Sequence, residues 1–375
     1  MAENRSPMPT PHEHLRGAGD SRPVAVVTAL DEVLRDALVA SLLLDGEGLL
    51  ALRYEVAEDF SALRRLVVAA DGVREDELVD LAHPCVSCAM REDAVPTLAR
   101  LAGLPEVTGI LLAPPLSADP SIVAGTLRPH GDAWHLASAV ALAAAGTASE
   151  DLLGDATLAE RGLRWADGDA RSVGEALAAQ LEYSDVIVLS GEADGPGAEL
   201  VEHLRAPEQR LLHDPFAVAV PDVLGGQLDH AAALRRRDAR HVEPYGGPTD
   251  HGTWTLDLLC ERPFHPGRLL ANIEALGGGR LRGRGRFWVP DRPDSICQWD
   301  GAGGQVSIGA VWRTDSELPT TRLVVTGQDP ADLPRVRDAF ARSLLTLQEW
   351  ARGLAPWLGA EDPLAPWLGE RDARV

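Results

Sequence analysis

The sequence predicts an α/β domain on a mostly parallel sheet, followed by a smaller α+β domain. Its 375 residues suggest two domains, because single hydrophobic cores rarely grow beyond roughly 250 to 300 residues. In the first part, apolar runs typical of buried strands alternate with segments of helical spacing, which favours a parallel sheet covered by helices on both faces. In the later part, short strands flank two helices.

The first domain is expected at residues 22–225, after a disordered tail at 1–21 that is rich in Pro, His, Arg and Gly. The apolar stretch from Pro23 to Thr28 predicts its first strand, and Asp31 to Leu44 follows with helical spacing. The stretch from Asp132 to Ala145 is ambiguous between strand and helix. Further expected elements are strands at 66–70, 109–113 and 185–190 and helices at 94–102 and 172–182.

A linker is expected at 226–247, where the Arg235–Arg237 run favours a solvated segment over an interaction patch. The second domain is expected at 248–346, with strands at 253–258, 285–289, 305–311 and 323–326 and helices at 266–276 and 330–346. The remaining tail, 347–375, repeats Leu-Ala-Pro-Trp-Leu-Gly at Leu354 and Leu364. Two copies are too few for a solenoid, so the repeat indicates a docking segment or an accidental duplication.

Composition excludes several classes of activity. All 35 basic residues are arginine, so chemistry that needs a lysine amine is absent, including Schiff bases and an intact phosphate-binding loop ending in Gly-Lys-Ser/Thr. The net charge of -22 opposes an electrostatic grip on bare DNA or on an anionic membrane. Without a signal-peptide core or an apolar run of about 20 residues, we expect a cytoplasmic protein.

Several separate motifs occur in the order typical of one protein family. The first is the segment from His83 to Asp93, which reads His-Pro-Cys-Val-Ser-Cys-Ala-Met-Arg-Glu-Asp. The second domain adds Arg-Pro-Phe-His-Pro at Arg262, Gly-Arg-Gly-Arg-Phe-Trp-Val at Gly283, Arg-Pro-Asp at Arg292 and Gly303-Gly304. Over about residues 22 to 345 the chain thus resembles CobW-type proteins, a P-loop GTPase family of metal chaperones and cofactor-assembly factors. The resemblance implies a P-loop NTPase-like parallel-sheet domain and a smaller α+β CobW C-terminal domain.

Within that family, the sequence of these segments is most similar to the mycobacterial-type recruitment factors (MRF). These factors recruit a ribosome hibernation factor and are made under zinc starvation. The supporting features are Cys85-Val86-Ser87-Cys88, the Pro-rich break after the strand at Ile110, and the stretch from Val325 to Pro330 before the last helix.

The family frame predicts a degenerate nucleotide site. In the family, the first strand runs into a Gly-rich loop with Gly-Lys-Thr. That frame places Arg35 at the lysine and Asp36 at the magnesium-binding hydroxyl, with Glu32 and Leu34 at glycines. Side chains at the glycine positions would block the backbone cradle, and the carboxylates would repel a triphosphate.

The other nucleotide motifs differ as well. Ala113 and Leu116 stand where the family has the Glu and Gly of Glu-x-x-Gly, and the guanine-recognition Lys-x-Asp is absent, with Asp194 one place beyond it. Arg35, Asp36 and Asp194 therefore remain as the candidate residues of a pseudo-GTPase site with little or no GTP hydrolysis. No catalytic residue is assigned, and GTP with magnesium is the weaker of the two expected cofactors.

Zinc is the other expected cofactor. Cys85 and Cys88 have the Cys-x-x-Cys spacing that lets two thiolates face one Zn²⁺, and His83 lies two residues earlier as a third candidate ligand. The alternatives are structural or incidental cysteines, or a redox pair, for which the thioredoxin-like context is missing.

Other conspicuous residues have plainer interpretations. His265 is expected to begin a helix, and Cys260, Cys297, Trp288, Trp299 and Trp312 are expected in the core. The arginines at 280, 282, 284 and 286 alternate, which in a strand would place them all on one face. That face is expected either to be solvated beside nearby acids or to contact ribosomal RNA or an acidic partner.

The resemblance implies an adaptor of zinc homeostasis that recruits a ribosome hibernation factor to the small ribosomal subunit when zinc is scarce. DNA and membranes are not expected partners. The alternative is a GTP-dependent zinc metallochaperone, an enzyme that couples GTP hydrolysis to metal delivery.

Overall fold

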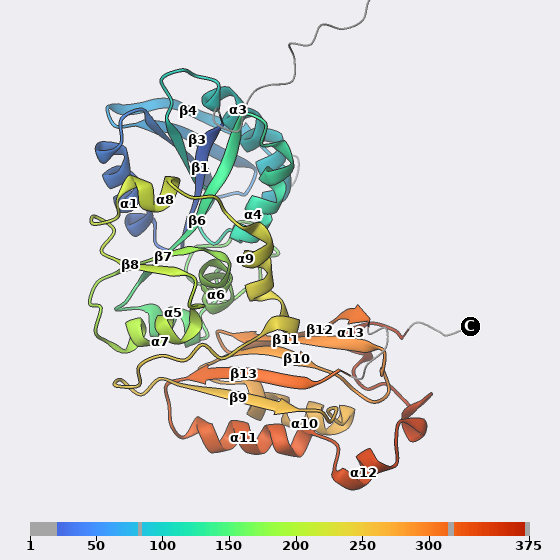
Figure 1. Ribbon diagram of the computed structural model, residues 1–375. Coiled ribbons are helices and arrows are strands. Elements are labelled where there is room, and N and C mark those ends of the chain that lie inside the picture. The colour runs from blue at the N-terminus through green and yellow to red at the C-terminus, as the bar shows by residue number, and fades with distance from the viewer. Residues whose placement is uncertain (1–20, 82–84, 314–318, 372–375) are drawn as a thin grey trace, which may run out of the picture.

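The computed structural model describes residues 21–81, 85–313 and 319–371. The expected disordered tail therefore lies outside the described residues except for Ser21, and so does the side chain of Trp312. The chain forms an α/β domain followed by an antiparallel-sheet domain, as the sequence predicts (Figure 1). Among the described residues, no helix is both long and apolar enough to cross a membrane.

The first domain is built on a sheet in the strand order β4-β3-β2-β5-β1-β6-β7-β8. Neighbours from β2 to β8 in this order run parallel, whereas β3 and β4 extend the sheet as an antiparallel edge. The ambiguous stretch after Asp132 is a strand. The strands are β1 (Arg22–Ala29), β2 (Leu49–Val56), β3 (Ala62–Ala69), β4 (Gly72–Asp80), β5 (Gly109–Ala113), β6 (Trp134–Ala144), β7 (Val186–Ser190) and β8 (Arg210–His213).

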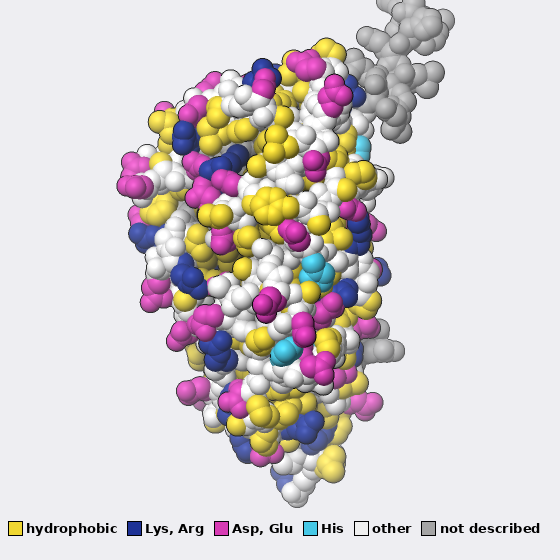
Figure 2. All heavy atoms as spheres, turned by 90° about the vertical axis from the view of Figure 1, so that its left-hand side faces the viewer, with side chains coloured by type: hydrophobic (Ala, Val, Ile, Leu, Met, Phe, Trp, Pro, Cys, Tyr) yellow, Lys and Arg dark blue, Asp and Glu magenta, His cyan; other side chains and the backbone are white. Residues whose placement is uncertain are grey.

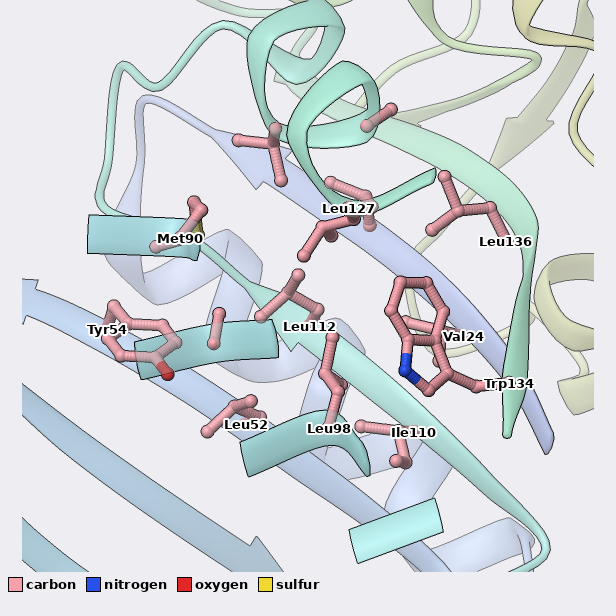
Figure 3. Close-up of a cluster of buried hydrophobic side chains, with 14 of the residues drawn as sticks. Val24, Leu52, Tyr54, Met90, Leu98, Ile110, Leu112, Leu127, Trp134 and Leu136 are labelled. Atoms are coloured by element: carbon pink, nitrogen blue, oxygen red, sulfur yellow. The ribbon is translucent and has the colours of Figure 1, made fainter. Parts of the chain in front are cut away.

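Helices cover both faces of this sheet because its central strands are apolar on both sides. In β1, Val24 and Val26 pack into one core layer, and Ala25 and Val27 pack into the layer on the opposite face. Figure 3 shows residues of the first layer gathered between the sheet and its helices. The helices are α1 (Glu32–Asp45), α2 (Val86–Ala89), the π-helix η1 (Met90–Ala94), α3 (Val95–Ala102), α4 (Pro120–Leu127), η2 (Arg128–His130), α5 (Ala148–Leu153), α6 (Val173–Tyr183), α7 (Pro196–Leu204), α8 (Val220–Leu224), α9 (His230–Arg237) and η3 (Ala239–His241).

The second domain is an antiparallel sheet in the order β12-β11-β10-β13-β9. Helices α10 and α11 lie on the face away from the first domain (Figure 1). His265 begins α10 as predicted, since its ring accepts a hydrogen bond from the Arg268 amide. The elements are β9 (Trp254–Cys260), α10 (Pro266–Gly277), β10 (Leu281–Phe287), β11 (Ser295–Ala302), β12 (Gln305–Arg313), β13 (Thr321–Gly327), α11 (Asp332–Ser343), α12 (Leu347–Ala351), η4 (Ala355–Trp357) and α13 (Ala365–Leu368).

The core of the second domain contains the residues expected there. Trp288, Trp299 and Cys297 are fully buried, and the half-buried Cys260 packs against the same cluster. The second copy of the C-terminal repeat packs into this core through Leu364 and Leu368, which is a docking role.

The arginine stripe of β10 is the centre of the contact between the two domains. Arg282 is 3% exposed and donates to Glu182 of α6 at 2.7 and 2.9 Å, and it also contacts Asp300. Arg284 donates to the carbonyl of Arg236, and Arg280 pairs with Glu150. Arg282, Arg284 and Arg286 alternate along β10 and contact the first domain, so neither expectation holds for them. Arg280 precedes the strand and is 52% exposed beside Glu150, as the solvated interpretation expects.

The segment expected as a solvated linker also contacts the first domain. Residues 230–241 form α9 and η3. Arg236 is buried and donates to the carbonyls of Glu182 and Ser184, while Arg237 pairs with Asp119 at 2.8 Å. The solvated interpretation is therefore wrong for Arg236 and Arg237, whose guanidinium groups bind carbonyls at the end of α6 and the carboxylate of Asp119, and it holds for the exposed Arg235.

Removing the carboxylate of Glu182 should destabilise the contact between the domains. A Glu182→Gln variant leaves the buried guanidinium of Arg282 with only part of its charge balanced, so we expect the free energy of unfolding to fall by about 3 kcal/mol. The matched variant Glu150→Gln breaks the exposed pair with Arg280 and should cost under about 1 kcal/mol. Urea unfolding measures both, and equal losses would contradict this account.

The same pair predicts an acid dependence. Burial raises the pKa of Glu182, but the guanidinium groups of Arg282 and Arg284 outweigh burial and hold that pKa below its ordinary value of 4.5. The stabilisation is therefore complete above about pH 4.5 and is lost as the pH falls through the lowered pKa. Unfolding midpoints measured from pH 7 down to pH 3 should fall less steeply in Glu182→Gln than in the wild type.

Candidate functional site

The connection between β1 and α1 is too short to form a phosphate-binding loop. The strand ends at Ala29 and the helix begins at Glu32, so only two residues lie between them. Asp31 caps the helix, since its carboxylate accepts a hydrogen bond from the Leu34 amide at 3.0 Å. A phosphate cradle needs a wide, Gly-rich turn whose free amides converge on the anion. Here a carboxylate of the chain itself occupies that end of the helix.

Arg35 and Asp36 belong to an ion cluster that also contains Glu32, Arg53 and Glu55. Arg35 is 1% exposed and donates to Asp36 at 2.9 Å and to Glu32 at 3.3 Å. Arg53 of β2 donates to Asp36 at 2.6 Å and to Glu32 at 2.7 Å, and it also contacts Glu55. Both guanidinium groups are therefore engaged by carboxylates of the chain.

A hollow of about 500 Å³ lies beside this ion cluster at the carboxyl ends of β1, β2 and β5. The carboxylates of Glu32, Glu55 and Glu58 line it, together with the apolar Leu163 and the ring of Phe60. Arg35 and Arg164 also line the hollow, but Arg35 is already paired with Glu32 and Asp36, so the three carboxylates exceed the cations that remain for a triphosphate. The closed β1–α1 connection offers no amides for one. The residues present do not fit a nucleotide.

The loop that covers the hollow is held by a strained serine. Ser117 is buried and has a φ of 65°, a left-handed conformation that favours glycine. Its hydroxyl donates to the carbonyl of Leu163 at 2.7 Å, and its carbonyl accepts from Arg171 at 3.1 Å. Leu116, at the family's glycine position, lines the hollow as an apolar wall.

Asp194 does not join these residues. Its side chain is 96% exposed and contacts Nε2 of His251, at 2.8 Å, on the segment that leads into β9. This contact raises the pKa of His251. Among the three residues expected at a nucleotide site, the structure thus brings together only Arg35 and Asp36.

The two cysteines lie together at the start of α2. The Sγ atom of Cys85 accepts a hydrogen bond from the Cys88 amide at 3.4 Å and lies 3.2 Å from the Ser87 hydroxyl. Arg91 donates to the Sγ atom of Cys88 at 3.5 Å. The hydroxyl of Ser87 lowers the pKa of Cys85, whereas the hydrogen bond with Cys85 raises the pKa of Cys88. Ser87, which replaces a cysteine of the family motif, thus supports a thiolate beside it.

The described residues supply only part of a metal site. Cys85 and Cys88 are both half-buried, and neither is in a disulfide. His83 lies outside the described residues. Within 21–81, 85–313 and 319–371, no group of three or more His, Cys, Asp or Glu side chains is arranged to hold a metal ion. Any complete zinc site at this helix therefore needs a ligand beyond those described.

A buried network anchors the helix that follows the cysteines. Tyr54 of β2 donates its hydroxyl to Asp93 at 2.6 Å, and Arg65 of β3 donates to the same carboxylate at 2.6 Å. Burial raises the pKa of Tyr54 well above its ordinary range, so its proton stays in this bond. Figure 3 shows Tyr54 among the core residues beside Met90. Sequence reasoning missed Tyr54, Arg53 and Arg65, because they lie on strands that are paired only by the tertiary fold.

Comparisons with known proteins agree with this architecture. Residues 254–344 match the model of the cobalamin synthesis protein CobW C-terminal domain. A zinc chaperone of Mycobacterium tuberculosis is 28% identical over 258 residues, which cover 64% of this chain and 61% of that protein. A zinc-regulated GTPase metalloprotein activator 1 of Dictyostelium discoideum is 26% identical and covers 62% of this chain and 54% of that protein. The chain thus spans less than two thirds of the length of each relative.

Among solved structures, the chain is similar to a Zn(II)-bound YjiA GTPase from E. coli. That likeness covers 87% of this chain and 99% of the other, at 16% identity and a TM-score of 0.34. The sequence match identifies residues 254–344, which form the second domain, as a cobalamin synthesis protein CobW C-terminal domain.

Proposed function

We propose that this chain is a CobW-type adaptor of zinc homeostasis that binds Zn²⁺ without running a GTP cycle. The observation that carries the proposal is the pair of half-buried thiols at Cys85 and Cys88. The Cys88 amide and Arg91 donate to their sulfur atoms, and the Ser87 hydroxyl is hydrogen-bonded to Cys85. Two thiolates one helical turn apart suit a tetrahedral zinc ion, and His83 is the proposed third ligand. The relatives named as a zinc chaperone and a zinc-regulated activator support zinc as the metal.

The structure of the β1–α1 connection supports the proposal that the chain does not run a GTP cycle. A GTPase switches because the phosphates of its nucleotide hold loops that relax after hydrolysis. In this chain the ion cluster already neutralises Arg35, and the Asp31 carboxylate caps the helix that would bind phosphate. Binding a triphosphate would require both contacts to break and carboxylates to approach the phosphates.

We further propose, from the family resemblance, that the adaptor brings a ribosome hibernation factor to the small ribosomal subunit during zinc starvation. The acidic surface implied by a net charge of -22 favours contact through a protein over direct contact with ribosomal RNA. The alternative function is a GTP-dependent zinc metallochaperone, which the relative named as a zinc-regulated GTPase metalloprotein activator favours.

Zinc binding should depend on both cysteines. In competition with a chromophoric chelator at pH 7.5, the wild type should bind about one Zn²⁺, and Cys85→Ser with Cys88→Ser should weaken binding more than about tenfold, because hydroxyls are poor zinc ligands. Cys260→Ser is the matched control, because Cys260 lies in the second domain and should leave the affinity unchanged. Equal affinity in the wild type and the double variant would remove the metal proposal.

GTP should neither bind tightly nor turn over. Calorimetric titration with GTP and Mg²⁺ up to millimolar concentration should give no saturable heat, and phosphate release should stay at the level of a no-protein control. Arg35→Lys restores the lysine but not the loop, so we expect it to behave like the wild type. Tight magnesium-dependent binding with turnover would instead establish the metallochaperone alternative.

Zinc depletion should bring the protein to ribosomes. After growth with a zinc chelator, we expect the tagged chain to sediment with small ribosomal subunits in a sucrose gradient, and to stay at the top of the gradient in zinc-replete cells. Deleting the hibernation factor should abolish the shift. If sedimentation depends on neither zinc nor the hibernation factor, the recruitment proposal is contradicted. The zinc-binding proposal does not depend on this result.

A further inference from the structure

An open apolar hollow lies at the edge of the first sheet opposite to the ion cluster. Its volume is about 600 Å³, and its lining comes from the end of α1, the start of β2, the end of β3 and the end of α3. Leu43, Leu49, Val67 and Val107 form a buried floor, and Leu44 beside them is 75% exposed. An exposed leucine next to a preformed apolar hollow is typical of an interaction site.

Acidic side chains surround this hollow, and several of them have no cationic partner. Asp71 is paired with Arg74 at 2.8 Å, and Glu75 is paired with Arg100 at 2.7 Å. In contrast, no arginine within the described ranges pairs with Asp45, Glu47 or Glu106, which also line the hollow. Figure 2 shows hydrophobic side chains gathered near the upper end of this face, with both acidic and basic side chains around them.

We propose that this hollow, the α1–β2 hollow, docks a basic peptide segment of a partner protein, one that presents a single apolar side chain between arginines or lysines. The apolar side chain would cover Leu44 and fill the floor, and its flanking cations would face Asp45, Glu47 and Glu106. Burial of the apolar side chain would supply most of the affinity. The carboxylates of Asp45, Glu47 and Glu106 would favour a positively charged partner. A second copy of this chain fits poorly, because two molecules that each carry a net charge of -22 repel one another.

The α1–β2 hollow is separate from the proposed zinc and nucleotide regions. It lies at the amino ends of β2 and β5, whereas the ion cluster lies at their carboxyl ends. Its lining includes neither Cys85 nor Cys88. Docking at this hollow can therefore succeed or fail independently of metal binding.

The test is selection from a display library of random 12-residue peptides against the immobilised full chain. We expect the enriched peptides to carry Leu, Met or Phe flanked by Arg or Lys, and to be lost when selection uses Leu44→Glu. Val33→Glu is the matched control, because Val33 is 76% exposed at the other end of the same helix and lies outside the hollow. Acidic enriched peptides, or selection that is indifferent to Leu44→Glu, would overturn the proposal.

Titration of the best peptide then separates the two parts of the site. Asp45→Asn with Glu47→Gln and Glu106→Gln should weaken binding about tenfold, as the loss of three exposed ion pairs of ordinary strength implies, and 0.5 M salt should have a similar effect. Unchanged affinity in this triple variant would remove the basic partner. Analytical ultracentrifugation provides a second readout, since a dimer abolished by Leu44→Glu would assign the hollow to a second copy and overturn the proposal.

Discussion

The short connection between β1 and α1 constrains the first domain more than any other feature. β1 lies in the middle of the parallel sheet, between β5 and β6, so whatever follows it faces the carboxyl edge where ligands of α/β sheets bind. Starting α1 two residues after the strand leaves no loop there. The first turn of the helix then places Glu32, Arg35 and Asp36 at this edge, and Arg53 from β2 completes their charge balance. The acidity of the adjacent hollow follows from the same residues.

Buried arginines of this chain each bind several acceptors, which a lysine side chain could not do at the same cost. Arg282 divides its donors among the carboxylate of Glu182, Asp300 and the carbonyls of Gly283 and Gly301. A planar guanidinium can satisfy several acceptors while buried, whereas a lysine ammonium is more strongly hydrated and more costly to bury. Arg236 similarly collects the carbonyls at the end of α6. The absence of lysine therefore accompanies a domain contact that uses multidentate arginines.

Local patterns predicted the parts of the fold that are apolar and continuous. The strand at 109–113 is found with those bounds, and the predicted first strand and first helix each differ from the observed elements by only one or two residues. The strands β2 and β4 were not predicted. In β4 a charged run from Arg74 to Glu77 replaces apolar alternation, whereas β2 does alternate from Leu52 to Val56. Arg64 and Arg65 on β3 pair with Asp76 and Glu77 on β4, so the charges are satisfied across strands that sequence periodicity cannot pair.

The candidate site divides in the same way. The cysteine pair could be predicted because its spacing is local, and Cys85 and Cys88 do meet at one helix start. The partners of the β10 arginines could not be predicted, because Arg282 and Glu182 lie 100 residues apart in the chain. A basic stripe was therefore interpreted as a surface, when its charge is balanced by a carboxylate from the other domain.

Strand β2 contacts both the ion cluster and the helix that follows the two cysteines. Arg53 of β2 belongs to the ion cluster, and the next residue, Tyr54, donates to Asp93 behind the cysteine helix. Successive residues of a strand point to opposite faces of the sheet. Strand β2 therefore contacts the ion cluster on one face and the helix that follows the cysteines on the other. In a GTPase, such a connection would transmit the state of the nucleotide to the metal ligands. Here Arg53 of β2 is paired with carboxylates of α1, a contact that supports the proposal of zinc binding without a nucleotide.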